Sequence, residues 1–255
     1  MGSSEIEAGM RPFEAGSDRA AAPGHFVVVR LEGRGFGKLL RGRHELDRPL
    51  DVRVRDILIA TADHLMNGAL PVVYGHTHSD EITLLLRRDE GTRPWLASAA
   101  LAGEASARCT LLLGSLASFG ARVAELPDAA RVAAYFAGRQ AAAVEAALQV
   151  HCGWELQQRG ASEADARARV EAAAELGASG VAALAGELGI DAAALPDWQT
   201  RGVALVWERP EPIQPRTGAP VVLRRRVRVL LELAAGEDYA ALVRAQAERA
   251  AAPEL

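Results

Sequence analysis

Short apolar runs and longer stretches of helical spacing follow one another along the chain, and polar turn residues separate them. The β-branched run at 26–32 predicts the first buried strand. Residues 71–74 predict a short strand. The Gly75-His76-Thr77-His78 turn then leads into a strand at 80–87, so this part is expected to form a hairpin. Further strands are predicted at 121–126, 203–207 and 221–233.

The other patterned stretches have helical spacing. Pro49 and Asp51 suit the start of a helix that runs to about Asn67, and Gly68 suits its end. The glycines between positions 33 and 42 predict a flexible connection before that helix. More helices are expected at 95–118, from 127 onwards, at 139–159, from a capping box at 162–165, in short alanine-rich pieces to about 188, and at 237–251.

This order of elements predicts an α+β protein with an antiparallel sheet. Strands and helices are interspersed, but the regular βαβ rhythm of a doubly wound sheet is missing. We expect a flexible N-terminal arm at 1–24 and a C-terminal helix at 236–255. Between them, residues 25–235 are expected to form one domain, with its core at about 25–140 and added helices and C-terminal strands at about 141–235.

The last predicted strand has a cationic face. From 221 to 233 the side chains alternate, with Arg224, Arg226 and Arg228 on one face and mainly apolar residues on the other. This alternation favours an edge strand with a solvated cationic face. A surface for nucleic acid is the alternative.

Composition narrows the class of protein. The 255 residues are 49% hydrophobic and carry a formal net charge of −4, which argues against nucleic-acid binding through overall charge. The only two cysteines, Cys109 and Cys152, have no metal-like spacing and fit a reducing cytosol. No stretch approaches 18 consecutive apolar residues, and the N-terminus lacks the apolar segment of a signal peptide, so we expect a cytoplasmic protein without a membrane span.

Carboxylates end two of the predicted strands. Glu32 closes the first strand, and Asp80-Glu81 open the strand of the hairpin. If these strands are neighbours, about 5 Å apart, the carboxylates meet at one place. Two Mg²⁺ ions about 3.5–4 Å apart need such an arrangement to hold a triphosphate for in-line attack. The sequence therefore predicts a two-metal site for nucleotidyl transfer.

Several motifs together resemble the tRNA-His guanylyltransferase family, and specifically its bacterial and archaeal branch. The resemblance spans about residues 10–235. The segments that carry it are Met10-Arg11-Pro12-Phe13-Glu14, Arg30-Leu31-Glu32-Gly33-Arg34-Gly35-Phe36, Tyr74-Gly75-His76-Thr77-His78-Ser79-Asp80-Glu81, Leu101-Ala102-Gly103-Glu104-Ala105-Ser106-Ala107, Tyr135-Phe136-Ala137-Gly138-Arg139-Gln140, Leu195-Pro196, and Arg201-Gly202-Val203 with Trp207.

The resemblance implies a polymerase-palm-like core and a magnesium-dependent nucleotidyltransferase. Such enzymes add nucleotides to the 5′ end of tRNA, or repair truncated 5′ ends against the opposite strand. A 5′-monophosphate is first activated with ATP or GTP, and the 3′-hydroxyl of an incoming nucleoside triphosphate then attacks it. The implied partners are a tRNA or another RNA 5′ end and nucleoside triphosphates. A dimer or tetramer of the chain is expected by analogy.

The resemblance also implies roles for individual residues. Glu32 and Asp80 would bridge two Mg²⁺ ions, with the Gly33 carbonyl completing the ligand set, because magnesium prefers hard oxygen ligands. Glu81 is expected on the opposite face from Asp80, where it would act as a supporting or priming-site acid. Nucleotide contacts are implied for Arg30, Gly33, Arg34, Gly35, Phe36, Arg48, Ser79 and Arg139.

The chain departs from the family pattern at several positions. Glu32 stands where the family has aspartate. Ala143 to Leu148 replaces a His-x-x-Asn segment, Ala193-Ala194 replaces Asn-Glu, and the basic cluster after the second metal motif is reduced to Arg87, Arg88 and Arg93. Alanine cannot hydrogen-bond a base or a phosphate. Two alternatives to the RNA enzyme therefore stay open, namely a diverged binding or partner module without polymerase activity, and a palm-type enzyme on a small nucleotide.

Overall fold

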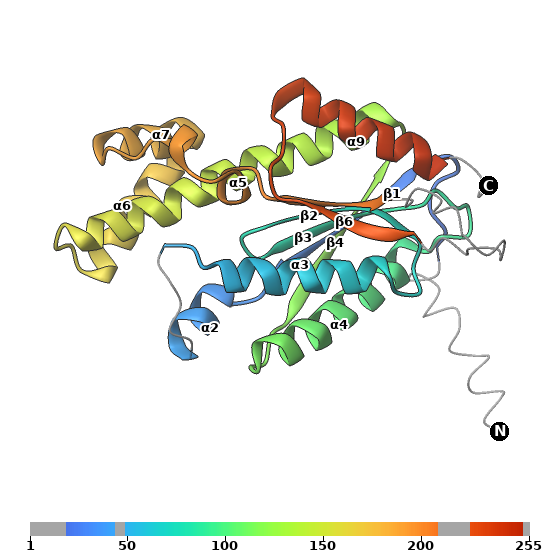
Figure 1. Cartoon of the computed structure of the whole chain (residues 1–255), viewed down its shortest axis with the longest axis horizontal. Coiled ribbons are helices and arrows are strands. Elements are labelled where there is room, and N and C mark those ends of the chain that lie inside the picture. The colour runs from blue at the N-terminus through green and yellow to red at the C-terminus, as the bar shows by residue number, and fades with distance from the viewer. Residues whose placement is uncertain (1–18, 44–48, 209–224, 252–255) are drawn as a thin grey trace, which may run out of the picture.

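A computed structural model describes residues 19–43, 49–208 and 225–251 (Figure 1). Its centre is a six-stranded sheet with the order β4-β1-β3-β2-β5-β6, in which every neighbouring pair is antiparallel. The predicted α+β class with an antiparallel sheet is therefore confirmed. The strands are β1 (Phe26–Gly33), β2 (Val72–His78), β3 (Glu81–Leu86), β4 (Phe119–Leu126), β5 (Val203–Glu208) and β6 (Arg226–Leu230).

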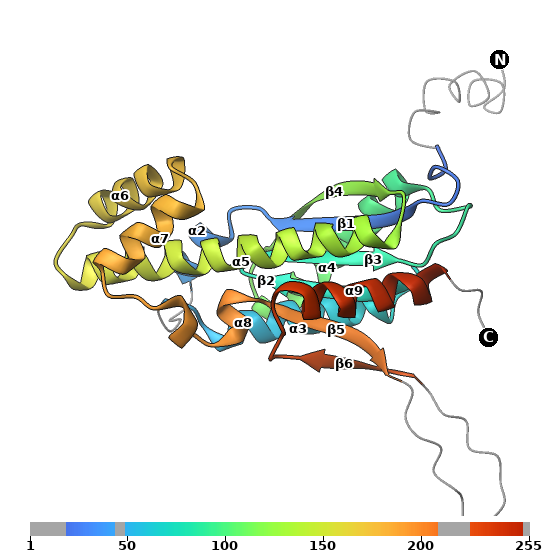
Figure 2. The same ribbon diagram turned by 90° about the horizontal axis from the view of Figure 1, so that it is seen from above.

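Helices cover both faces of the sheet (Figures 1 and 2). In Figure 1, α3 and α4 lie below the sheet, and α5 and α9 lie above it. The α-helices are α2 (Phe36–Arg43), α3 (Val52–Met66), α4 (Pro94–Leu113), α5 (Ala129–Gln158), α6 (Glu163–Glu175), α7 (Ala178–Glu187), α8 (Asp197–Thr200) and α9 (Gly236–Ala251), and a 3₁₀ turn, η2, spans Ala192–Ala194.

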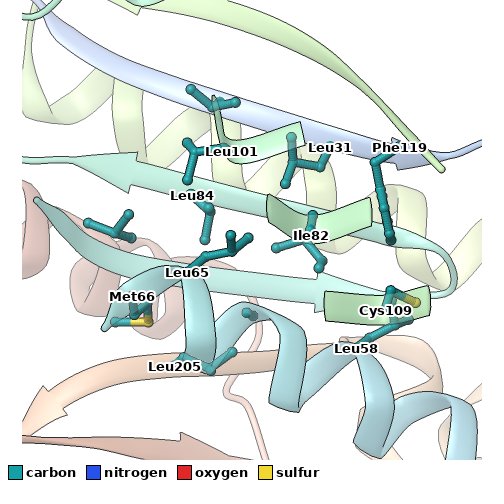
Figure 3. Close-up of a cluster of buried hydrophobic side chains, with 14 of the residues drawn as sticks. Leu31, Leu58, Leu65, Met66, Ile82, Leu84, Leu101, Cys109, Phe119 and Leu205 are labelled. Carbon is teal, nitrogen blue, oxygen red and sulfur yellow. The ribbon is translucent and has the colours of Figure 1, made fainter. Parts of the chain in front are cut away.

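Alternation along the strands builds a separate core on each face. Val27, Val29 and Leu31 of β1 point to α3 and α4, where they meet Leu65 and Leu101 (Figure 3). The intervening β1 residues point to the other face, where Phe26 and Val28 pack with residues of α5 and α9 such as Phe136 and Tyr239. A third cluster joins the C-terminal half of α5 to α6 and α7, beyond the end of the sheet (Figure 2).

Side-chain caps explain where three of the helices begin. Asp51 accepts a hydrogen bond from the Arg53 N–H at the start of α3. Asp128 does the same at α5 and Ser162 at α6, so the helix start predicted at Ser162 is confirmed. These caps satisfy backbone N–H groups that have no partner within the helix.

Helix α4 is the one helix among the described residues whose length and composition would also suit a membrane span. In this fold it packs on the sheet beside α3. Ala97, Leu101, Ala105 and Cys109 lie in the core, while the opposite face of the helix is exposed.

The structure corrects the prediction between residues 33 and 43. The expected flexible connection contains the helix α2, which follows Gly35 at a φ of 68°. Phe36 is buried against the core and Leu39 packs at its edge. Each glycine inside a helix costs about 1 kcal/mol relative to alanine, and the burial of Phe36 offsets that cost.

The predicted position of the hairpin turn was wrong. Gly75 to His78 belong to β2, and the turn consists of Ser79 and Asp80. The polar residues 76–78 form a strand because β2 pairs with β3 on one side and β5 on the other. Two helices predicted after residue 127 are one continuous helix of 30 residues, α5.

The end of the sheet agrees with the prediction. β6 pairs only with β5 and is an edge strand of the described sheet. Arg226 and Arg228 form ion pairs with Glu208 of β5 and remain exposed. Arg224, Arg48, the loop expected at 210–220 and residues 1–18 of the predicted arm lie outside the described residues.

Candidate functional site

The sheet brings the predicted carboxylates to one place. β1 and β3 are neighbours, and Glu32 lies directly opposite Glu81 in their register. The Gly33 N–H donates to the Asp80 carbonyl at 2.9 Å. Because opposite residues of an antiparallel pair point to the same face, Glu32 and Glu81 share the face covered by α5 and α9. Asp80 lies one residue away, in the turn.

Glu81 is the most enclosed of the three carboxylates. It is 6% exposed and accepts hydrogen bonds from Arg139 at 3.0 Å and Thr83 at 2.9 Å. Nε2 of His78 is 3.5 Å from the carboxylate. Burial alone raises the pKa of Glu81, but His78, Arg139 and Thr83 outweigh it and lower the pKa to about 2. Glu81 is therefore a firmly held anion within a network of side chains.

Glu32 is more open and is held by two arginines. Its Oε1 is 2.6 Å from Arg30 Nη2, and its Oε2 is 3.2 Å from Arg122 Nε. The Arg30 Nε also lies 3.8 Å from Glu81. Arg30 therefore bridges both carboxylates. Arg122 faces Arg30 from β4, and its role was not predicted from the sequence.

Asp80 differs from both glutamates because no arginine among the described residues neutralises it. Among the described residues its carboxylate has no ion pair, and it is half-buried. Burial raises the pKa of Asp80, and the charges of Glu81 and Glu32 raise it further, against its own backbone N–H and the charge of His78. The structure thus leaves one partly buried carboxylate in need of a cation.

The residue before Asp80 has unusual backbone geometry. Ser79 has a φ of 51°, and it is the one described non-glycine residue with a positive φ. Such a conformation costs about 1–3 kcal/mol and is concentrated at functional turns. The turn presents Asp80 at the wall of a cavity and leaves the Ser79 side chain exposed.

A cavity of about 320 Å³ opens beside this turn. Its walls come from the start of α2, the start of α3, the β2–β3 turn, the middle of α5 and α8. The α5 wall consists of small apolar side chains, and the β2–β3 turn, α3 and α8 contribute polar ones. Its lining includes Asp51, Arg55, Ser79, Asp80, Ala143, Ala146, Ala147, Val150, Trp198 and Gln199.

The other residues with predicted nucleotide contacts fall into three groups. Arg30 and Arg139 lie beside the carboxylates and bind them. Phe36 lines the cavity, but its ring is buried and packs 5.2 Å from Phe119. Gly33 lies close to the Phe36 ring, since a Cβ at Gly33 would lie 2.5 Å from it. Arg34 and Gly35 are exposed.

Two buried histidines sit next to the carboxylates. His76 is fully buried, and its Nε2 donates to the Arg201 carbonyl at 2.9 Å. Burial and the charge of His78 lower the pKa of His76 to about 4, so the ring is neutral at pH 7.

The donor set for a metal consists of hard oxygens. Among the described residues, no group of three or more His, Cys, Asp or Glu side chains could hold an ion. Glu32, Asp80 and the Gly33 carbonyl supply two carboxylates and one main-chain oxygen. Magnesium is often bound by one or two carboxylates, with substrate phosphates and water completing its shell. The donor set therefore fits magnesium bound together with a nucleotide.

The far wall of the cavity was missed by sequence reasoning. Trp198 and Gln199 on α8, and Arg55 on α3, meet there. The Arg55 guanidinium lies 5.0 Å from the centre of the Trp198 ring. No motif marks these residues, because only the packing of α8 against α5 brings them to the cavity.

One family model matches the chain. The profile described as tRNAHis guanylyltransferase matches residues 7–141, which is more than half of the 255-residue chain. No curated protein matches the sequence.

Solved structures share the fold. A bacterial tRNA(His) guanylyltransferase (Thg1)-like protein in complex with GTP has a TM-score of 0.69 at 21% identity, covering 95% of this chain and 99% of that chain. A bacterial protein of the same description in complex with ATP has a TM-score of 0.68 at 21% identity, covering 96% of this chain and 98% of that one. The tRNA(His) guanylyltransferase of Saccharomyces cerevisiae has a TM-score of 0.60 at 16% identity, covering 76% of this chain and 90% of that one.

Proposed function

Because this chain belongs to the tRNA-His guanylyltransferase family, we propose that it is a magnesium-dependent nucleotidyltransferase that adds nucleotides to the 5′ end of tRNA or a related RNA. The observation that carries the proposal is the Asp80 carboxylate. It is partly buried at the wall of the cavity, has no ion pair among the described residues, and lies beside Glu32 and Gly33.

Glu32, Asp80 and the Gly33 carbonyl would hold the magnesium. The metal would neutralise charge on the phosphates and on the attacking oxygen, which is the main contribution of metal ions to phosphoryl transfer. Asp80 supplies the carboxylate that no described arginine pairs with, and Glu32 supplies a second one at the end of the neighbouring strand.

The remaining residues of the site hold this geometry. Arg30 and Arg139 fix the Glu81 carboxylate, and Arg30 and Arg122 fix Glu32. Fixed side chains need no reorganisation during the reaction, which is how a preorganised site lowers a barrier. Ser79 is an exposed hydroxyl next to Asp80, and we assign it a phosphate contact.

The cavity would take the nucleoside part of ATP or GTP. It is concave, mostly apolar, and has a few polar groups, as ligand sites generally do. The two bacterial structures with GTP and ATP support this assignment by their shared fold. By analogy with the family, we also predict that the chain forms a homo-oligomer and that it is located in the cytoplasm.

One observation favours the second candidate, a diverged module that binds nucleotide or RNA without polymerising. Ala143, Ala146 and Ala147 line the cavity where the family pattern has hydrogen-bonding residues. Apolar side chains can enclose a base but cannot orient it. A palm-type enzyme on a small nucleotide would be favoured by the same wall, because it needs no contacts to RNA.

The test offers labelled GTP and ATP with magnesium to a 5′-truncated tRNA. Asp80→Asn keeps the size of the side chain but removes its charge, and Glu90→Gln is the matched control at an exposed carboxyl group. Incorporation by the wild type and by Glu90→Gln, with loss in Asp80→Asn, supports the proposal. Folded wild-type protein that binds nucleotides but incorporates none supports the binding module. Incorporation by Asp80→Asn at the wild-type rate contradicts the role of Asp80.

A further inference from the structure

Gln199 is a polar side chain of the cavity wall whose amide group is held by a hydrogen bond. It lies on α8 and lines the cavity wall. Its amide oxygen is 2.8 Å from Nε2 of His151 on α5. An amide oxygen can only accept, so the His151 Nε2 carries the hydrogen and donates it.

This hydrogen bond fixes which end of the amide is free. With Oε1 facing His151, the Gln199 NH₂ group has no hydrogen bond to any described residue. Gln199 is half-buried and lines the cavity. A free donor held in one orientation at a cavity wall can select a ligand by its hydrogen-bonding pattern.

Glu81 and Gln199 contact α5 at positions that flank its cavity-lining residues, 143–150. On α5, Arg139 binds Glu81, and His151 binds Gln199. These two positions are twelve residues apart, or about 18 Å of helix. If the phosphates lie beside Asp80, the nucleoside extends along the α5 wall toward Gln199.

The wall between these ends suits a base. Ala143, Ala146, Ala147 and Val150 are apolar side chains of the cavity wall. The Trp198 ring, with the Arg55 guanidinium 5.0 Å from its centre, also lines the cavity. Stacking on an aromatic ring holds any base, because every base has a π face. The apolar α5 wall therefore does not distinguish one base from another. The fixed amide of Gln199 can make that distinction.

We propose that Gln199, oriented by His151, selects nucleotides whose base presents a carbonyl oxygen, such as guanine or uracil, over those that present an amino group, such as adenine or cytosine. The Gln199 N–H would donate to guanine O6, whereas the N6 amino group of adenine would place a donor against a donor. This inference rests on the proposed function, since it requires a nucleotide in the cavity.

The first experiment measures dissociation constants of the wild-type protein for GTP, inosine triphosphate and ATP in magnesium. Inosine keeps O6 and lacks the 2-amino group, so it separates contacts to O6 from contacts to the 2-amino group. GTP and inosine triphosphate are expected to bind alike, and ATP about tenfold more weakly, as the loss of one hydrogen bond predicts. Equal binding of ATP and GTP, or binding of inosine triphosphate as weak as that of ATP, would overturn the inference.

Three variants test the residue itself. Gln199→Glu keeps the bond from His151 but turns the free donor into an acceptor, so the preference should reverse toward ATP. Gln199→Met removes the hydrogen bonds at similar size and should abolish the preference, while His151→Phe frees the amide to rotate and should weaken it. Gln158→Glu and Gln158→Met, at an exposed position on α5, are matched controls that should keep the wild-type ratio.

The outcomes separate this inference from the proposed function. If the wild type binds none of the three nucleotides, the proposed function and this inference both fail. If nucleotides bind but the GTP-to-ATP ratio is the same in wild type, Gln199→Glu and His151→Phe, only the inference fails. Melting temperatures without nucleotide show whether each variant is folded. If a variant is not folded, the wild-type comparison of GTP, inosine triphosphate and ATP still tests whether the site selects the base by its O6 atom.

Discussion

Glu32 and Glu81 face each other across β1 and β3, and the guanidinium group of Arg30 lies between their carboxylates. Its Nη2 is 2.6 Å from Glu32, and its Nε is 3.8 Å from Glu81. Two like charges directly opposite in a sheet are destabilising, and the shared arginine removes that repulsion. The same arginine keeps both carboxylates in fixed positions beside Asp80.

Replacing Arg30 should therefore destabilise the fold. In Arg30→Met, Glu32 and Glu81 would repel each other, and the Arg30 side chain is largely buried. We expect a loss of about 1–3 kcal/mol in the free energy of unfolding, measured by urea denaturation. Arg226→Met removes an exposed ion pair with Glu208 and is the control, with an expected loss below about 1 kcal/mol. Equal losses in the two variants would show that the bridge by Arg30 stabilises the fold no more than an exposed ion pair does.

The free energy of unfolding should decrease as the pH is lowered, because His76 takes up a proton. Burial and the charge of His78 lower its pKa to about 4 in the fold, from 6.5 in the unfolded chain. Between these values the unfolded state binds the proton and the folded state does not. The stabilisation is therefore complete above pH 6.5 and is lost as the pH falls to about 4, by up to roughly 3 kcal/mol.

The measurement is urea denaturation of the metal-free protein at several pH values. His76→Gln retains an N–H donor for the Arg201 carbonyl but does not titrate. Its free energy of unfolding should vary less between pH 6.5 and pH 4 than that of the wild type. Parallel curves for the two proteins would contradict a buried neutral His76.

Gly202 should tolerate no side chain. Its φ is 77°, and a Cβ would lie 2.6 Å from His76 Nε2 and 2.7 Å from the Thr77 carbonyl oxygen. Gly160 has a φ of 97° with nothing near its Cβ position, so Gly160→Ala measures the backbone strain alone. We expect a loss of about 1 kcal/mol for Gly160→Ala and at least about 2 kcal/mol for Gly202→Ala, read from thermal unfolding. A smaller loss at Gly202 than at Gly160 would mean that β2 and β5 pack less closely here.

Trp198 should contribute to nucleotide affinity. Its ring lines the cavity with Arg55 stacked 5.0 Å from its centre, and base stacking is worth about 1–3 kcal/mol. Trp198→Leu should weaken binding of GTP and ATP alike, by about tenfold or more, in isothermal titration with magnesium. Trp95→Leu is the control at an exposed tryptophan on α4. Unchanged affinity in Trp198→Leu would place the base elsewhere.

Much of the fold follows from local patterns. The runs of β1 and β5, the helix starts at Asp51 and Ser162, and the edge strand β6 were all predicted, because each depends on residues close in sequence. The hairpin turn was misplaced because residues 75–78 are polar. They belong to a strand only because β2 lies inside the sheet, between β3 and β5.

By itself the sequence determined which acidic residues end the buried strands. It showed carboxylates at the ends of apolar strands, at Glu32 and at Asp80-Glu81, and a set of motifs specific to one family. Such signals are local, since the order of residues fixes the strand and its polar end. Only the tertiary structure decided how charge is distributed among these groups. Register places Glu81 opposite Glu32, α5 brings Arg139, and β4 brings Arg122, whereas Asp80 is left without an ion pair among the described residues. Those contacts join segments far apart in the chain, and no local pattern encodes them.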